Sequence, residues 1–217
     1  LIDGAHSSSM DVSVIGGAGH VGLPMGLVSV RAGHTTRLID TDIDKLNQVT
    51  AGTIPFKEKG ADAILQMGLE KGLIQTSPDI SEIANSDVVI VTVGTPIDEH
   101  NNPDMENLFS IVDGMKPHLN EETLFVLRST VYPGTTTIIR DELERSGLTA
   151  EEDFLISYAP ERIVQHNAIE GMINLPQIIG AFDDASYEVS LDFFESIIES
   201  NCYRLLPTEA EMGKLFT

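Results

Sequence analysis

Cysteine and basic side chains are scarce in this chain of 217 residues. Its one cysteine, Cys202, excludes a disulfide within the chain, so we expect a reducing compartment, the cytoplasm. Lys and Arg number 13 against 34 Asp and Glu, which gives a formal net charge of −21. Because so acidic a surface repels phosphate backbones and anionic lipids, we expect neither nucleic acid nor a membrane as a partner.

Long apolar runs are also absent. No stretch approaches the roughly 18 residues that span a bilayer. The opening LIDGAHSSSM lacks the charged and then apolar layout of a signal peptide. We interpret residues 1–9 as a tag remnant before a native Met10, and we expect no metal site.

The apolar residues that are present form short runs, often β-branched, as is typical of strands buried on both faces of a parallel sheet. Segments of helical length lie between them. The alternation predicts an α/β fold, a Rossmann-type doubly wound, mostly parallel sheet with helices on both faces. The predicted strands are 11–16, 35–40, 87–94, 124–129, 154–159, 177–182 and 201–206, and the predicted helices are 23–32, 41–52, 103–119 and 135–147.

A cluster of glycines, VIGGAGHVGLP, follows the first predicted strand. Residues 17–22 fit the pattern G-x-G-x-x-G, and Asp40 ends the next strand 18 residues past Gly22. We expect Gly17 to permit the tight turn, Gly19 to let a pyrophosphate approach the backbone, and Gly22 to let the helix pack close to the strand. The alternative is a glycine turn that serves only close packing.

This loop predicts a dinucleotide site. His20 and Val21 complete it, and we expect the backbone N–H of His20 to matter more than its imidazole. The free N–H groups and the positive dipole end of the following helix suit phosphates. Asp40 would accept hydrogen bonds from ribose hydroxyls and would repel a 2′-phosphate, so the sequence favours NAD over NADP.

Five motifs occur in order: GAGHVGLP, GTPIDEHNNPDM, RSTVYPGTT, YAPERI and AEMGKL. Together they resemble the UDP-glucose/GDP-mannose dehydrogenase family over nearly all of residues 10–217. The resemblance implies NAD-dependent oxidation of C6 of a nucleotide-bound sugar to a carboxylate. The family does this by two hydride transfers, through a thiohemiacetal and then a thioester on a cysteine.

The resemblance also assigns roles to single residues. Asp40 matches a ribose-binding acid, Lys45 a basic residue near the adenosine ribose, and Thr95 a threonine on the nicotinamide side of the cofactor. Taken alone, Lys45 reads as a solvated helix charge and Thr95 as a helix N-cap.

Three further residues match catalytic positions of the family. Thr130 would lie by the cofactor and order a catalytic water. Glu161 would act as general base or orient water if burial raises its pKa. Lys214 would stabilise a developing oxyanion. The alternatives are a turn for Thr130, a surface charge for Glu161 and an exposed helical lysine for Lys214.

The form PERIVQHNA resembles the branch acting on UDP-N-acetylhexosamines such as UDP-N-acetylmannosamine. Members that act on UDP-glucose tend to have a second Glu where this chain has Gln165. The family nucleophile lies in a second domain, and Cys202 has no flanking glycines, so we expect Cys202 to be inert. UDP-glucose 6-dehydrogenase, a β-hydroxyacid dehydrogenase and a stand-alone NAD-binding module remain alternatives.

These assignments predict the domain organisation. Residues 10–205 would form the NAD-binding Rossmann domain, and residues 206–217 would start a helix leading to an absent second domain. The chain alone would bind NAD without full turnover. The full-length protein would be a homodimer that acts on a UDP-sugar.

The acidic, lysine-poor composition suggests a salt-loving host, because such surfaces stay soluble at high salt. We therefore expect the chain to unfold or associate at low ionic strength, where its negative charges repel one another unscreened. Circular dichroism and gel filtration across a salt series would measure this. A chain that stays folded and monodisperse without added salt would contradict it.

Overall fold

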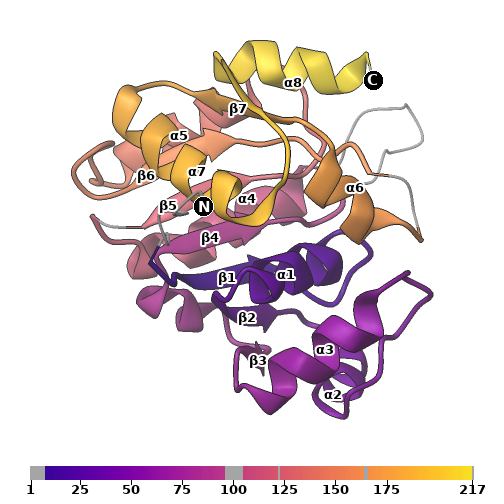
Figure 1. Ribbon diagram of the computed structural model, residues 1–217. Helices are drawn as coiled ribbons and strands as arrows, with labels where there is room; N and C mark the ends of the chain where they lie inside the picture. The colour runs from indigo at the N-terminus through magenta and orange to yellow at the C-terminus, as the bar shows by residue number, and fades with distance from the viewer. Residues whose placement is uncertain (1–7, 96–104, 122, 164–165, 217) are drawn as a thin grey trace, which may run out of the picture.

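One eight-stranded sheet runs through the residues that the computed structural model describes, 8–95, 105–121, 123–163 and 166–216. The strand order is β3-β2-β1-β4-β5-β6-β7-β8, and the pairs are parallel except between β6 and β7 (Figure 1). This confirms the predicted doubly wound, mostly parallel sheet. The strands are β1 Asp11–Ile15, β2 Thr35–Ile39, β3 Ile74–Ser77, β4 Val88–Val91, β5 Leu124–Leu127, β6 Leu155–Tyr158, β7 Gln177–Ala181 and β8 Cys202–Leu205.

Helices cover both faces of the sheet (Figure 1). One apolar core holds side chains of α1, α2, α3, α6 and α7, and a second holds side chains of η1, α4, α5 and α8. Their bounds are α1 Gly22–Arg31, α2 Ile43–Thr50, α3 Ala61–Glu70, α6 Ala168–Asn174 and α7 Asp184–Ile197 on the first face, and η1 Ile80–Asn85, α4 Glu106–Met115, α5 Thr135–Arg145 and α8 Pro207–Leu215 on the second; η2, Lys116–His118, follows α4.

Strand β4 shows why the strands are continuous apolar runs. Val88 and Ile90 belong to the first core, whereas Val89 and Val91 belong to the second, and all four are fully buried. Successive side chains of a strand point to opposite faces, so a strand covered on both faces needs an apolar residue at every position.

The order of the strands reverses at β1. Strand β1 pairs with β2 on one side and with β4 on the other, so that Val14 lies beside both Leu38 and Ile90. The loops that leave the carboxyl ends of β1 and β4 therefore diverge. In open α/β sheets this is the place where ligands bind.

Five elements were not predicted from the sequence: β3, η1, α3, α6 and α7. Strand β3 (IQTS) lies at the sheet edge and is only half-buried, so it lacks an apolar run. Helix α6 has seven residues, and its first turn depends on a distant side chain, because Glu58 accepts a hydrogen bond from Ile169 N at 3.1 Å. Helix α7 does carry a local signal, since Asp183 caps it by accepting from Ser186 N at 2.6 Å.

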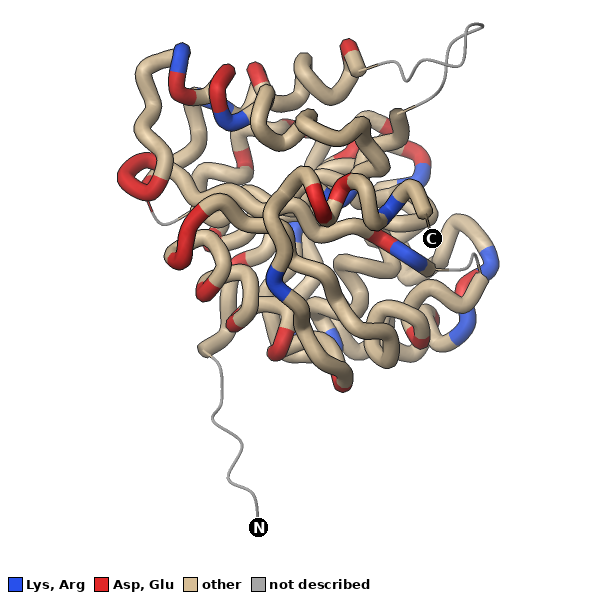
Figure 2. Tube along the Cα trace, turned by 90° about the horizontal axis from the view of Figure 1, so that it is seen from above, with Lys and Arg blue, Asp and Glu red and all other residues tan. Residues whose placement is uncertain are grey.

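Parts of several predictions lie outside the described residues: positions 1–7 of the tag remnant, positions 96–104 of the GTPIDEHNNPDM motif, positions 103–104 of the predicted helix 103–119, Gln165, and position 217 of the predicted connecting helix. On the described part, acidic residues occur on loops and helices around most of the periphery, and basic residues are fewer (Figure 2). No helix of that part is long and apolar enough to cross a membrane.

His34 joins three segments of the fold. It is buried after the turn that leads from α1 to β2, and its Nδ1 accepts a hydrogen bond from Met10 N at 3.1 Å. Its Nε2 lies 2.7 Å from Ser196 Oγ of α7. Because Nδ1 is an acceptor, the ring is neutral and Nε2 carries the proton. Burial lowers the pKa of His34, and the negative charge of Asp87 opposes this.

We predict that His34→Gln changes how stability depends on pH. The folded chain has the lower His34 pKa, so the unfolded chain takes up the proton first as pH falls. The stabilisation is therefore full above about pH 6.5 and is lost below it. Near pH 8 we expect the variant to be about 1 kcal/mol less stable than wild type, and near pH 5 the difference should shrink. Urea unfolding measures it, with His118→Gln as the control. A difference that is constant with pH would contradict the prediction.

Candidate active site

The glycine loop between β1 and α1 forms the centre of the site. The positive φ in the tight turn belongs to Gly16 (+81°) and not to Gly17. Gly17 is needed for close approach, because a Cβ there would lie 2.8 Å from Leu38 Cα of β2. A Cβ on Gly22 would lie 2.0 Å from Gly16 O, so its absence lets α1 begin against the end of β1. A Cβ on Gly19 would meet only Gly16 O, at 3.2 Å, and its other sides are open.

The backbone N–H groups of this loop divide into two kinds. Ala18 N donates to Asp40 Oδ2 at 2.9 Å. The N–H groups of His20 and Val21 have no acceptor among the described residues. They stand immediately before the first turn of α1, at the positive end of the helix dipole, so they suit an anion such as a phosphate. The His20 ring packs on Phe56 with ring centroids 4.2 Å apart.

Asp40 stands at the carboxyl end of β2, beside a small cleft. Its two carboxylate oxygens accept hydrogen bonds from Ala18 N and from Asp42 N at 3.0 Å, and each keeps a lone pair for a further donor. The cleft has a volume of about 160 Å³ and mostly apolar walls, with the Asp40 carboxylate at one end. It therefore suits a planar aromatic ring system that is linked to a group bearing hydroxyls. It is lined by Ile15, Gly16, Ile39, Asp40, Thr41, Pro78, Ile80, Val93, Asn107 and Ile111.

Lys45 lies close to this cleft without lining it. Its Nζ pairs with Asp42 Oδ2 at 2.9 Å, and both side chains are exposed. The hydrogen bond raises the pKa of Lys45 and lowers that of Asp42. Asp42 also caps α2 by accepting from Lys45 N at 3.1 Å.

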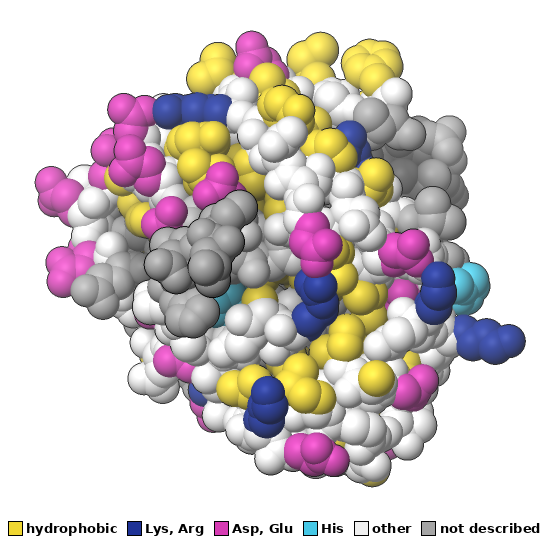
Figure 3. Space-filling model, in the orientation of Figure 1, with side chains coloured by type: hydrophobic (Ala, Val, Ile, Leu, Met, Phe, Trp, Pro, Cys, Tyr) yellow, Lys and Arg dark blue, Asp and Glu magenta, His cyan; other side chains and the backbone are white. Residues whose placement is uncertain are grey.

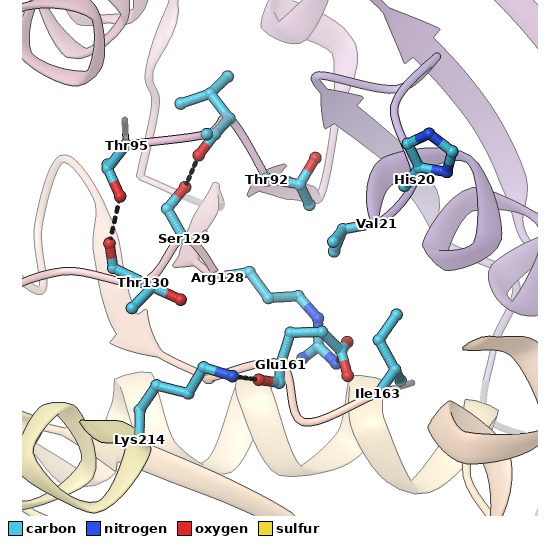
Figure 4. A pocket seen from close by; sticks show the side chains of 12 residues that line it. His20, Val21, Thr92, Thr95, Arg128, Ser129, Thr130, Glu161, Ile163 and Lys214 are labelled. Atoms are coloured by element: carbon cyan, nitrogen blue, oxygen red, sulfur yellow. Dashed lines mark hydrogen bonds and ion pairs between the residues drawn. The ribbon is translucent and has the colours of Figure 1, made fainter. Parts of the chain in front are cut away.

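A larger cleft of about 380 Å³ opens on the other side of the glycine loop (Figure 4). It brings together six of the predicted site residues from motifs far apart in the sequence, and Val93 lines both clefts. Its walls are His20, Val21, Thr92, Val93, Gly94, Thr95, Arg128, Ser129, Thr130, Glu161, Ile163 and Lys214.

Two hydrogen bonds join the loops that leave β4 and β5. Ser129 Oγ donates to Val93 O, and Thr95 Oγ1 donates to Thr130 O, both at 2.6 Å (Figure 4). Thr95 is therefore held by a loop contact and caps no described helix. The side chain of Thr130 is exposed and lies on the cleft wall.

Glu161 is held by a buried cation. Arg128 donates to Glu161 Oε2, and the two side chains are only 3% and 10% exposed. Arg128 also donates to Ala159 O at 3.1 Å and to Gln177 Oε1 at 3.0 Å, and Arg162 N donates to Glu161 Oε1 at 2.7 Å. These bonds aim the carboxylate and compensate its desolvation. Sequence reasoning missed Arg128, although a charge at the end of the apolar run LFVLRS was a usable signal.

Lys214 reaches the cleft from α8, which lies against β7 (Figure 1). Its half-buried Nζ donates to the backbone carbonyl of Glu161. Burial lowers the pKa of Lys214; the Glu161 charge opposes this, and the Arg128 and Arg162 charges reinforce it. An amine, a carboxylate and a hydroxyl of Thr130 thus face one cavity.

Glu211, one turn before Lys214, fixes the position of α8. Its fully buried carboxylate accepts hydrogen bonds from Gly134 N at 2.5 Å, Thr136 N at 2.7 Å and Thr136 Oγ1 at 2.5 Å. These donors form the first turn of α5, so a negative charge sits at the positive end of that helix. This residue also was not singled out from the sequence.

Cys202 lies on edge strand β8 and lines neither cleft. It is half-buried, and burial, reinforced by the charge of Glu195, raises the pKa of its thiol to about 11. The thiol is therefore protonated at neutral pH, and a protonated thiol is a poor nucleophile.

The fold and the two clefts define a dinucleotide-binding domain of the Rossmann type. The chain belongs to the UDP-glucose/GDP-mannose dehydrogenase family, whose NAD-binding domain matches residues 10–198.

Individual relatives agree with this assignment. A UDP-N-acetyl-D-mannosamine dehydrogenase of Methanococcus aeolicus is 26% identical over 99% of this chain and 48% of the relative. A UDP-glucose 6-dehydrogenase of Rickettsia felis is 27% identical over 88% of this chain and 42% of the relative. The solved structure of a UDP-D-ManNAc dehydrogenase from Pyrococcus horikoshii shares the fold, with a TM-score of 0.90 and 24% identity over 95% of this chain and 49% of that one. The chain thus spans about half the length of these relatives.

We predict that Glu211→Gln destabilises the chain by about 2 kcal/mol, because a glutamine offers one acceptor oxygen to three donors and lacks the charge. Urea unfolding measures the change. Glu209→Gln is the matched control on the same helix, since its exposed carboxylate accepts from Leu206 N, at 2.9 Å, and from no other described residue. We expect the control to cost at most about 1 kcal/mol. Equal losses in the two variants would show that the buried carboxylate has no special role.

Proposed function

We propose that this chain is the cofactor half of an NAD-dependent 6-dehydrogenase that oxidises C6 of a UDP-N-acetylhexosamine to the uronate. The observation that carries the proposal is the larger cleft at the β1/β4 switch point. One wall presents the free N–H groups of the glycine loop, and the other presents Thr130, Glu161 and Lys214.

The two clefts fit one dinucleotide. Its adenosine would occupy the Asp40 cleft, with the ribose hydroxyls on the remaining lone pairs of the Asp40 carboxylate. Its pyrophosphate would accept hydrogen bonds from the N–H groups of His20 and Val21. Gly19, which has no side chain, would let the pyrophosphate come close to the backbone. The nicotinamide would lie in the larger cleft near Thr95 and Thr130. NAD, when bound, supplies the hydride acceptor.

The residues of the larger cleft have complementary charges. The ammonium of Lys214 would stabilise negative charge on the substrate oxygen as it develops. Glu161, held by Arg128, would accept a proton or orient a water, and the Thr130 hydroxyl would share that water. Buried surroundings strengthen each of these interactions.

The UDP-N-acetylhexosamine assignment draws on the PERI motif and on relatives named as UDP-N-acetyl-D-mannosamine dehydrogenases. UDP-glucose is the alternative substrate, because other relatives are named as UDP-glucose 6-dehydrogenases. The family match favours both over a β-hydroxyacid dehydrogenase. Assay of the whole gene product with each UDP-sugar, following NADH, separates the two. If the whole protein reduces NAD with neither sugar, the result would favour a stand-alone NAD-binding module.

We also propose the domain boundary at residue 205, with α8 starting a connecting helix, and a cytoplasmic homodimer for the whole protein. The support is an apolar surface on α8, visible along the top of Figure 3. Leu206, Met212 and Leu215 are about half exposed there, and Phe216, which follows the helix, is 84% exposed. Such a surface is typical of one that another chain or domain covers.

The cytoplasmic location rests on a different observation. The one cysteine of the chain, Cys202, has a protonated thiol, and a free thiol suits the reducing cytoplasm.

We predict that Asp40→Ala weakens NAD binding at least about tenfold, because it removes the ribose acceptor and the partner of Ala18 N. The ratio of the Kd for NADP to the Kd for NAD should fall as well, since the charge that repels the 2′-phosphate of NADP is gone. Calorimetric titration with each cofactor measures both effects.

Asp44→Ala is the matched control. It removes the same charge from an exposed position in the first turn of α2. We expect its NAD affinity to stay within about twofold of wild type. Unchanged NAD binding by the Asp40 variant would refute the assignment of the ribose site.

A further inference from the structure

Side chains from both neighbouring strands hold the glycine loop. On the β2 side, Asp40 accepts from Ala18 N. On the β4 side, Thr92 stands directly after the strand, and its Oγ1 donates to Ile15 O at 2.9 Å and lies 3.4 Å from Gly16 O. Asp40 is a familiar part of the dinucleotide fingerprint. Thr92 belongs to none of the motif positions used above.

The hydroxyl of Thr92 occupies a space that two glycines create. A Cβ on Gly16 would lie 2.9 Å from Thr92 Oγ1, and a Cβ on Gly22 would lie 2.7 Å from it. One hydroxyl therefore contacts the end of β1, the tight turn and the first residue of α1. The hydroxyl has one proton, which it donates to Ile15 O, and Gly16 O is its alternative acceptor. Each carbonyl also accepts a backbone N–H at 3.0 Å, from Thr92 N and from Gly19 N respectively, so the hydroxyl adds a second tie to each end of the turn.

We propose that Thr92 is a positioning residue for cofactor binding. It holds the glycine loop in the shape that leaves the His20 and Val21 N–H groups free for the pyrophosphate. The inference rests on the cofactor site proposed above and adds a residue to it. Without the hydroxyl, a smaller fraction of the molecules has the loop in that shape. The measured Kd rises in inverse proportion to this fraction, because only those molecules bind the cofactor.

The test compares three variants of the chain. Thr92→Val keeps the side-chain shape and removes the hydroxyl, and Thr92→Ser restores the hydroxyl. Thr123→Val removes a matched hydroxyl, because buried Thr123 Oγ1 donates to Ser86 O at 3.4 Å at the amino ends of β5 and β4, whereas the glycine loop lies at the carboxyl ends.

Two measurements are made on each variant. Calorimetry gives the Kd for NAD. Amide hydrogen exchange by NMR, without cofactor, follows Gly19 N and Leu23 N, which donate to Gly16 O and Gly19 O, both at 3.0 Å. We expect Thr92→Val to raise the Kd about fivefold and to speed exchange of both amides by more than that factor, because exchange follows the ratio of open to closed loop. Thr92→Ser and Thr123→Val should change neither by more than about twofold.

The outcomes separate this inference from the proposed function. If Thr92→Val binds NAD like wild type, or if the two amides exchange at the wild-type rate, the inference is overturned. Equal effects of Thr92→Val and Thr123→Val would overturn it too, since they would reflect general destabilisation. Failure of the wild-type chain to bind NAD would instead overturn the cofactor assignment, and the exchange rates would still decide whether Thr92 holds the loop.

Discussion

The position of β1 between β2 and β4 is the constraint on which the rest of the site depends. Because the strand order reverses there, the loop after β1 has a cleft on each side. Asp40 at the end of β2 borders one cleft, and the loops after β4 and β5 border the other. Val93 belongs to both walls, so a single extended ligand can cross from one to the other. In another strand order the same residues would lie on unrelated parts of the sheet edge.

Buried charges then fix the groups that this arrangement brings together. Arg128 holds Glu161, and Glu211 holds α8 and with it Lys214 against the amino end of α5. A buried charge that loses its partner is strongly destabilising, so these contacts permit few alternative arrangements. The proposed catalytic groups are thereby held on strand ends and a docked helix, which suits a site that must orient a sugar and a cofactor together.

Particular residues show how far the sequence could be read. The central strands were predictable because burial on both faces leaves an uninterrupted apolar run, as in VVIV of β4. Edge strand β3 and the short helix α6 escaped the same reading, because edge exposure and a distant capping residue, Glu58, replace local pattern there. The glycine pattern identified the loop, yet it placed the turn at Gly17, whereas Gly16 has the positive φ.

The sequence by itself determined the alternation of strands and helices, the glycine loop with Asp40 at its spacing, and the motifs that mark the family. These are features of short windows, set by periodicity and by the conformational freedom of single residues. The tertiary structure alone decided which side chains meet. Arg128 and Glu161 lie 33 residues apart, Thr92 and Gly16 76, and Gly134 and Glu211 77. Such pairings follow from strand order and helix docking, because a local pattern carries no information about which strand becomes the neighbour of which.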